Sequence, residues 1–175
     1  KGLRLIIFGL FIKMVVADNI GYYVDLIYEA PNKYNSWDII LGMFLYSFQI
    51  YGDFFGYSTI ALGSAKLIGY DITNNFNTPY LAKSIADFWH RWHISLSTWF
   101  RDYVYFPLGG SRVKFSRWAF NIMVVFVISG IWHGAAWNFL IWGAAHGLLH
   151  ILEKAILKHI PQRDNKGKIT TLIVD

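Results

Sequence analysis

The sequence lacks cysteine altogether and contains little charge. Without cysteine, the chain forms no disulfide bond, offers no thiolate nucleophile and binds no metal through sulfur. Charged residues make up 15% of the 175 residues, whereas 55% are hydrophobic and 19% are aromatic. An average soluble domain has about 25% charged residues. The composition therefore argues against an ordinary soluble domain and predicts that a lipid bilayer surrounds much of the chain.

The charge that is present is biased towards lysine and arginine, with a formal net charge of +5. The basic residues are scattered among tryptophans and apolar runs instead of forming one stripe. This pattern favours attraction to anionic lipid headgroups over nucleic-acid binding. The sequence has no initiating methionine and no signal-peptide pattern, and its last residues begin a new apolar run. We therefore expect an internal fragment of a larger membrane domain, with helices missing on both sides.

Four apolar segments are expected to enter the membrane. The first has one interior charge, Lys13, close enough to the segment's end to reach the interface. Residues 18–36 read as a loop with some interfacial helix. Residues 63–117 carry an excess of basic residues, so the positive-inside rule places them in the cytoplasm. The four segments are approximately residues 3–17, 37–62, 118–131 and 135–152.

The last two segments are separated by Trp132, His133 and Gly134 and are flanked by basic residues at both ends. Basic flanks imply an even number of crossings between them. We therefore expect a re-entrant helix hairpin that dips from the cytoplasmic side, with its turn deep in the protein. The predicted fold is an all-α, multi-pass transmembrane bundle with interfacial helices. All of residues 1–175 belong to this single domain, which is incomplete at both ends.

Residues 84–112 are predicted to form an interfacial region rich in tryptophan, histidine and arginine. Within it, residues 87–100 are expected to form one helix, with Phe88, Trp92 and Trp99 on one face. Indole rings and guanidinium groups are both stable at the headgroup layer. The helical pattern ends near Pro107.

Five segments carry a resemblance to a known family. They are Ile50–Ser58 (IYGDFFGYS), Asn75–Tyr80 (NFNTPY), Phe88–Gly110 (FWHRWHISLSTWFRDYVYFPLGG), Gly130–Trp137 (GIWHGAAW) and Trp142–Gly147 (WGAAHG). Their sequence and order resemble the membrane-bound O-acyltransferases, and among these the bacterial alginate-type polysaccharide O-acetyltransferases. The resemblance covers most of the chain and implies a multi-helix acyltransferase with a tunnel through the bilayer. It also implies an essential histidine, which maps to His133.

The chemistry of acyl transfer fits this assignment. Moving an acyl group from a thioester to a sugar hydroxyl requires a base to take the hydroxyl proton, and imidazole performs this role near neutral pH. We predict that His133 is the general base. His93 is predicted to orient the acceptor or to assist proton transfer. For both, a structural role, with the ring bonded to a neighbouring backbone or helix, is the alternative.

Further candidates are placed around the substrate. Trp132 and Trp137 lie close enough to His133 in sequence to shape its pocket, although membrane tryptophans are most often belt or core residues. Asp53 lies in an apolar stretch and needs a partner, for which we expect Arg91 or Arg101. Both arginines are also candidates for binding donor phosphates. The predicted substrate-binding residues are Trp132, Trp137, Asp53, Arg91, Arg101 and His146.

A metal site is considered and set aside. His146 and His150 are four residues apart on one helical face, and His90 and His93 are three apart. Neither pair has a nearby carboxylate in the sequence pattern. We expect no metal and no bound cofactor, with acetyl-coenzyme A or a carrier thioester as the acyl donor.

The predicted function is acetyl transfer from a cytoplasmic thioester towards the hydroxyls of an extracytoplasmic polysaccharide, as in alginate O-acetylation. The resemblance implies a multi-pass protein of the bacterial inner membrane that works with a polysaccharide-acetylation partner protein. D-alanyl transfer to a cell-wall polymer is the alternative within the family, although residues 105–110 resemble the acetylase branch more. Two further alternatives lie outside the acyltransferase family: a non-catalytic transporter and a structural scaffold. The chain shows no internal repeat of the kind that is typical of transporters.

Overall fold

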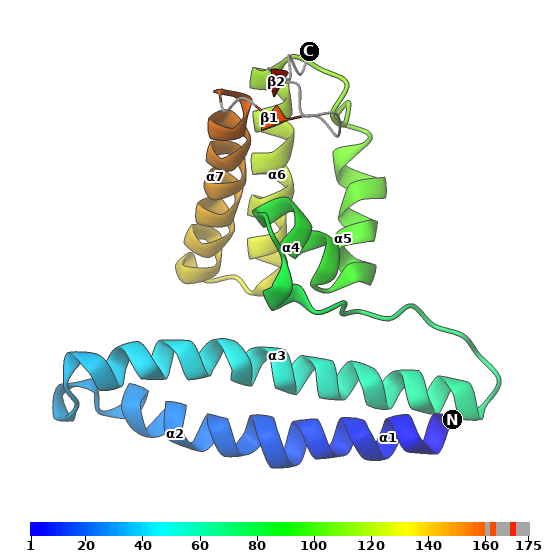
Figure 1. Ribbon diagram of the computed structural model, residues 1–175, viewed down its shortest axis with the longest axis vertical. Coiled ribbons are helices and arrows are strands. Elements are labelled where there is room, and N and C mark those ends of the chain that lie inside the picture. The colour runs from blue at the N-terminus through cyan, green and yellow to red at the C-terminus, as the bar shows by residue number, and fades with distance from the viewer. Residues whose placement is uncertain (160–161, 164–168, 171–175) are drawn as a thin grey trace. The chain divides into compact units, whose positions relative to one another are not determined.

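The computed structural model describes residues 1–159, 162–163 and 169–170 (Figure 1). This part of the chain is almost entirely helical, which confirms the predicted all-α class. The only strands within it are β1 (Gln162–Arg163) and β2 (Ile169–Thr170), two residues each and paired antiparallel. The chain forms two compact units, Lys1–Asn77 and Thr78–Asp175. That both belong to one membrane domain stays a prediction.

The first unit is a long helical pair. Helix α1 (Gly2–Leu10) continues through the π-helical segment η1 (Phe11–Ala17) into α2 (Asp18–Glu29) without leaving helical backbone angles. The expectation of a loop from residue 18 was wrong, because Val24 and Ile27 supply a buried apolar face that keeps the segment helical. A short 3₁₀ turn, η2 (Pro31–Lys33), then leads into α3 (Ser36–Leu67).

Helix α3 runs back alongside α1 and α2 (Figure 1). Its start is fixed by a capping box in which the Asn35 side chain accepts from the Asp38 amide and Asp38 accepts from the Asn35 amide. The contact with α1 is close. A Cβ atom on Gly9 would lie 2.7 Å from the carbonyl oxygen of Gly56, so neither position has room for a side chain. Small residues at such a contact are typical of membrane helix pairs.

The second unit contains the predicted interfacial region and the hairpin. Helix α6 (Phe115–His133) and helix α7 (Trp137–His159) run antiparallel and are joined by a three-residue turn (Figure 1). The predicted hairpin is therefore present, and its depth in a membrane stays a prediction. Before it come four short segments: η3 (Pro79–Leu81), α4 (Ile85–Arg91), α5 (Ile94–Phe100) and the π-helical η4 (Arg101–Tyr105).

The expected single helix over residues 87–100 was wrong. The helix breaks at Trp92 and His93, and His93 has a φ of +44°, in the left-handed region. Phe88 and Trp99 therefore lie on two different helices, and the predicted shared face does not exist. The sequence contains no proline or glycine at the break, which is why a local pattern did not reveal it.

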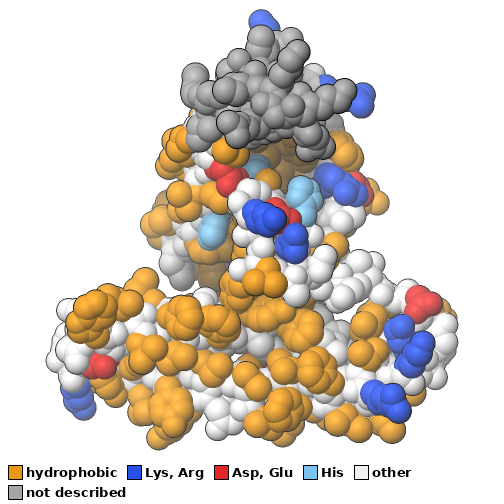
Figure 2. Space-filling view, in the orientation of Figure 1, with side chains coloured by type: hydrophobic (Ala, Val, Ile, Leu, Met, Phe, Trp, Pro, Cys, Tyr) orange, Lys and Arg blue, Asp and Glu red, His pale blue; other side chains and the backbone are white. Residues whose placement is uncertain are grey.

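Among the described residues, three helices are long and apolar enough to cross a membrane: α3, α6 and residues 137–158 of α7. They contain three of the four predicted segments. The fourth, residues 3–17, lies in α1 and η1, which continue into α2 as one run of helical backbone. Figure 2 shows hydrophobic side chains spread over the first unit, with charged side chains at its two ends. Among these exposed apolar residues are Leu3, Met14 and Met43.

Candidate active site

A pocket of about 440 Å³ lies within the second unit. Its walls come from α4, α5 and η4 on one side and from α6 and α7 on the other. Most of the lining is aromatic or aliphatic, and the polar side chains that interrupt it include several histidines. The elements that build the pocket are thus those of the predicted interfacial region and hairpin. A concave apolar site with a few polar groups is the usual form of a small-molecule site.

Both predicted catalytic histidines line this pocket. His93 stands at the α4–α5 break, where its left-handed backbone ends one helix and begins the next. Its ring centroid lies 6.2 Å from that of Trp132 at the end of α6. Burial lowers the pKa of His93 below its ordinary value, and the nearby charge of His133 lowers this pKa further. His93 is therefore held in its neutral form at neutral pH.

His133 is the last residue of α6. Its ring packs against Trp132 at 5.0 Å, Trp142 at 5.2 Å and Phe139 at 6.3 Å between centroids. The residue is nevertheless exposed, so the expectation of a deeply buried turn is not met within the part of the chain that the structure describes. His133 also lines the pocket.

A row of ring contacts continues from His133 along α7. Trp142 contacts His146 at 4.8 Å, and His146 contacts Trp89 of α4 at 5.2 Å. His150 follows one turn later, lines the pocket and contacts Trp118 at 5.7 Å. His146, a predicted substrate-binding residue, contacts Trp89 of the pocket lining but is not itself among the lining residues.

The two predicted arginines are each paired with a nearby carboxylate. Arg91 Nε donates to Asp87 Oδ1 at 2.7 Å, one turn along α4. This bond, with a further one from the Lys83 amide, holds the pKa of Asp87 below its usual value. Arg101 lines the pocket and donates to both oxygens of Asp102, at 2.8 and 3.3 Å.

Asp53 has a different partner from the one that the sequence led us to expect. It pairs with Lys13 at 2.5 Å, and Lys13 also lies 3.5 Å from Asp18. The expected pairing with Arg91 or Arg101 was wrong. The tight contact of α1 and η1 with α3 brings Lys13 and Asp53 together across 40 residues of sequence. Asp53 is not among the residues that line the pocket of the second unit.

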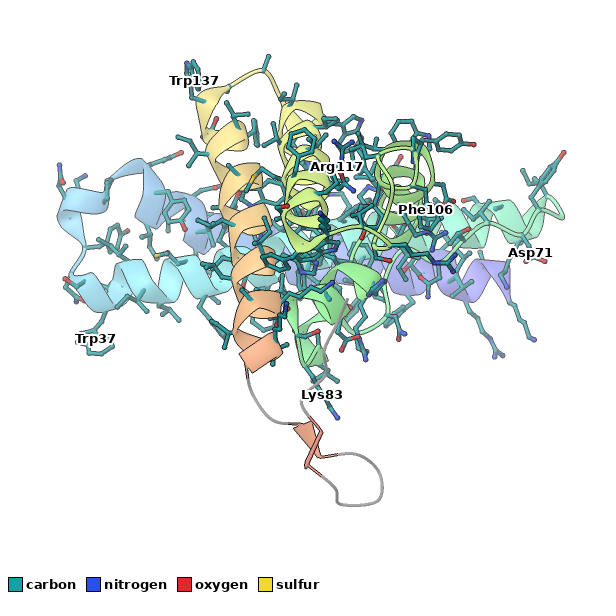
Figure 3. All side chains as sticks on the ribbon, turned by 90° about the horizontal axis from the view of Figure 1, so that it is seen from above. Trp37, Asp71, Lys83, Phe106, Arg117 and Trp137 are labelled. Atoms are coloured by element: carbon teal, nitrogen blue, oxygen red, sulfur yellow. The ribbon has the colours of Figure 1, made fainter. Side chains whose placement is uncertain are left out.

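The two predicted tryptophans differ in position. Trp132 contacts both His93 and His133 and so lies beside the two histidines. Trp137 opens α7 and is 79% exposed. Figure 3 shows it at the turn of the hairpin, with its side chain pointing outward.

Sequence reasoning missed three contributors to this region. Trp89 joins α4 to α7 through Trp142 and His146, whereas the sequence presented it as one interfacial tryptophan among several. His150 was considered only as half of a metal pair. Glu153 received no role, although it binds the start of α4. The helical spacing of His146, His150 and Glu153 on α7 was the available signal for a common face.

The charged and metal-ligating groups of the described residues form no cluster of three or more histidine, aspartate or glutamate side chains suited to a metal ion. The pocket's chemistry therefore rests on imidazole rings, hydroxyl groups and a guanidinium group. Imidazole accepts and donates protons near neutral pH. This arrangement suits proton transfer coupled to group transfer.

The sequence matches the model of one protein family over residues 2–173, and this model describes the membrane-bound O-acyltransferase family. Together with the helical fold and the histidine-lined pocket, the match defines the class: the chain belongs to the membrane-bound O-acyltransferase family. The family resemblance found in the sequence motifs is thereby confirmed.

Individual relatives are named for different activities. The peptidoglycan O-acetyltransferase of Helicobacter pylori is 42% identical over 154 residues, 88% of this chain and 29% of the relative. The probable alginate O-acetylase AlgI of Azotobacter vinelandii is 42% identical over 150 residues, 85% of this chain and 30% of the relative. The teichoic acid D-alanyltransferase of Bacillus subtilis is 35% identical over 156 residues, 85% of this chain and 39% of the relative. The chain thus spans about a third of the length of these relatives.

Proposed function

We propose that the chain supplies the acyl-transfer site of a bacterial inner-membrane O-acetyltransferase. The complete protein moves an acetyl group from a cytoplasmic thioester towards hydroxyls of an extracytoplasmic polysaccharide. Family membership and the two similar relatives named as O-acetyltransferases support the reaction class. The observation that carries the proposal is the meeting of His93 and His133 in one largely apolar pocket.

In the proposed mechanism, His133 takes the proton from the attacking hydroxyl. The hydroxyl oxygen forms a bond to the thioester carbonyl carbon, and the carbon–sulfur bond breaks. The proton on His133 then passes to the departing thiolate, so that one ester and one thiol are produced. His133 lines the pocket, which supports access of a bound hydroxyl to the ring.

His93 is proposed to orient the acceptor or to assist this proton transfer. Its lowered pKa keeps it neutral, so that it does not place a second positive charge beside His133 when His133 accepts a proton. Trp132 contacts both rings and is proposed to hold their relative position. Arg101 is the pocket residue best suited to a donor phosphate, because it lines the pocket and is half-exposed.

The remaining predicted residues have weaker support. Arg91 is engaged with Asp87, His146 is not among the pocket-lining residues, and Trp137 points outward. Asp53 pairs with Lys13 in the first unit. Their proposed contribution is to the shape and charge of the substrate path of the complete protein. The donor is acetyl-coenzyme A or a carrier thioester, and the acetyl group passes to the polymer through a partner protein.

D-alanyl transfer is the second candidate function. The observation that favours it is the Bacillus subtilis relative named as a teichoic acid D-alanyltransferase, which matches 85% of this chain. The same histidine chemistry would serve both acyl groups, since both reactions join an activated acyl group to a hydroxyl. We put acetyl transfer first, and the higher identity to the O-acetyltransferases supports this order.

The test is the O-acetyl content of the surface polysaccharide in cells that carry the complete protein with native His133, His133→Ala or His133→Gln. Both substitutions remove the base, and His133→Gln also preserves much of the side chain's volume. At equal membrane levels we expect both variants to lower the acetylation rate by about 10²-fold or more. Normal acetylation in both would overturn His133 as the base and would favour transport. Normal acetyl content with lost D-alanyl ester would favour the second candidate.

A further inference from the structure

The start of helix α4 is bound by a residue far away in the sequence. The first three amides of a helix have no partner within it, and here all three are occupied. Ser84 Oγ accepts from the Asp87 amide at 2.9 Å, which is an ordinary N-cap. The other two amides donate to Glu153 of α7. Ile85 N lies 2.9 and 3.1 Å from the two carboxylate oxygens, and Ala86 N lies 3.4 Å from one of them.

Helix α4 is attached to the hairpin a second time, near its other end. Trp89 packs on Trp142 and His146 of α7 and on Phe126 of α6, with centroid distances between 5.2 and 6.0 Å. The two α7 residues in these contacts, Trp142 and His146, precede Glu153 by about two or more helical turns. They therefore lie nearer to the loop that joins α6 to α7. Helix α4 therefore runs along α7 from Glu153 towards the turn, where His93 meets Trp132.

Two attachments fix the direction of a short helix, whereas one leaves it free to pivot. Helix α4 has only seven residues, so it depends on such contacts for its stability. The break at His93 follows α4 after a single residue, and any tilt of α4 moves the His93 ring relative to His133. A displacement of about 1 Å at a reacting group lowers a rate on the order of 10²-fold.

We propose that Glu153 is a positioning residue, which holds the amino end of α4 so that the α4–α5 break presents His93 to the pocket opposite His133. This inference rests on the proposed function for its catalytic consequence. The attachment itself is a property of the fold and is testable separately.

The first measurement is hydrogen exchange of the complete protein in detergent, for native protein, Glu153→Gln and Glu153→Ala. The Ala variant leaves two part-buried amides without an acceptor, so exchange over residues 85–93 should accelerate by about tenfold or more. The Gln variant retains one acceptor oxygen and should show a smaller increase. Exchange over α6 should stay unchanged. Native exchange rates over residues 85–93 in Glu153→Ala would overturn the inference.

The second measurement is a double-mutant cycle on the acetylation rate, with Glu153→Ala and His93→Ala alone and together. If Glu153 acts through His93, it should lower the rate about tenfold or more in the native background and have no further effect in the His93→Ala background. Additive losses would overturn the positioning role. Glu29→Gln and Glu29→Ala, at an exposed position of α2, are the matched controls and should retain the native rate.

The two proposals fail in different ways. If the native protein transfers no acetyl group, the proposed function falls while the exchange measurement still decides whether Glu153 holds α4. If exchange accelerates but acetylation is native in Glu153→Ala, the positioning role falls while the proposed function stands.

Discussion

At the scale of single residues, His93 combines an unfavourable backbone conformation with a half-buried ring. A non-glycine residue at φ +44° costs about 1–2 kcal/mol, which the surrounding contacts must offset. Such strained positions occur often at functional sites. The helix break at His93 places the imidazole ring in the pocket, in contact with Trp132.

The lowered pKa of His93 predicts a dependence of stability on pH. The unfolded chain takes up a proton on this ring near pH 6.5, whereas the folded chain does so only at a lower pH. The free energy of unfolding therefore falls as pH decreases below about 6.5. Thermal unfolding in detergent measures this effect. We expect the unfolding temperature to fall less from pH 7.5 to pH 5 in His93→Gln than in the native protein. Parallel losses in the two proteins would contradict the prediction.

At the scale of elements, the first unit depends on the fit between α1, η1 and α3. Gly9 and Gly56 allow the two backbones to approach, and this approach places Lys13 against Asp53. The pair lies within apolar segments, where an unpaired charge is costly. Its side chains are 37% and 52% exposed, so its contribution is below that of a fully buried pair.

Breaking this ion pair should destabilise the first unit. We expect Asp53→Leu or Lys13→Met alone to cost on the order of 1–2 kcal/mol, because each leaves the other charge without its main partner. The double variant should cost less than the sum of the two, since it leaves no orphaned charge. Thermal unfolding of the complete protein in detergent measures all three variants. Simple additivity would show that the pair contributes no coupling energy.

At the scale of the whole molecule, charge and helix length predict an orientation in the membrane. Helix α3 separates the η2 turn from the basic region that begins near residue 66, and the positive-inside rule assigns the latter to the cytoplasm. The basic residues that flank the α6–α7 hairpin favour the same side for both of its ends.

Cysteine labelling tests this orientation, and the absence of native cysteine in this chain simplifies it. We expect Asn32→Cys to react with a membrane-impermeant maleimide from outside intact spheroplasts. Lys83→Cys and Arg112→Cys should react only after the membrane is permeabilised. All three positions are exposed. Labelling of Lys83→Cys from outside would reverse the assigned orientation.

Much of the fold and part of the site followed from local sequence pattern. The segments 37–62, 118–131 and 135–152 lie in α3, α6 and α7 because a bilayer demands long apolar helices, and such runs are visible in the sequence. The hairpin followed from the polar interruption at residues 132–134. His93 and His133 were selected by motif and chemistry, and the structure brings both to one pocket.

The sequence by itself thus determined the helical class, three of the four apolar segments and the family, and it singled out two histidines whose catalytic roles stay a prediction. Only the tertiary structure decided that the helix breaks at His93, that Asp53 pairs with Lys13 and that Glu153 holds α4. Each of these depends on residues brought together by packing, the last two over 40 and 68 positions of sequence. Local periodicity reports which face of a helix is apolar. It carries no information on which distant side chain meets that face, because that choice depends on the packing of the whole unit.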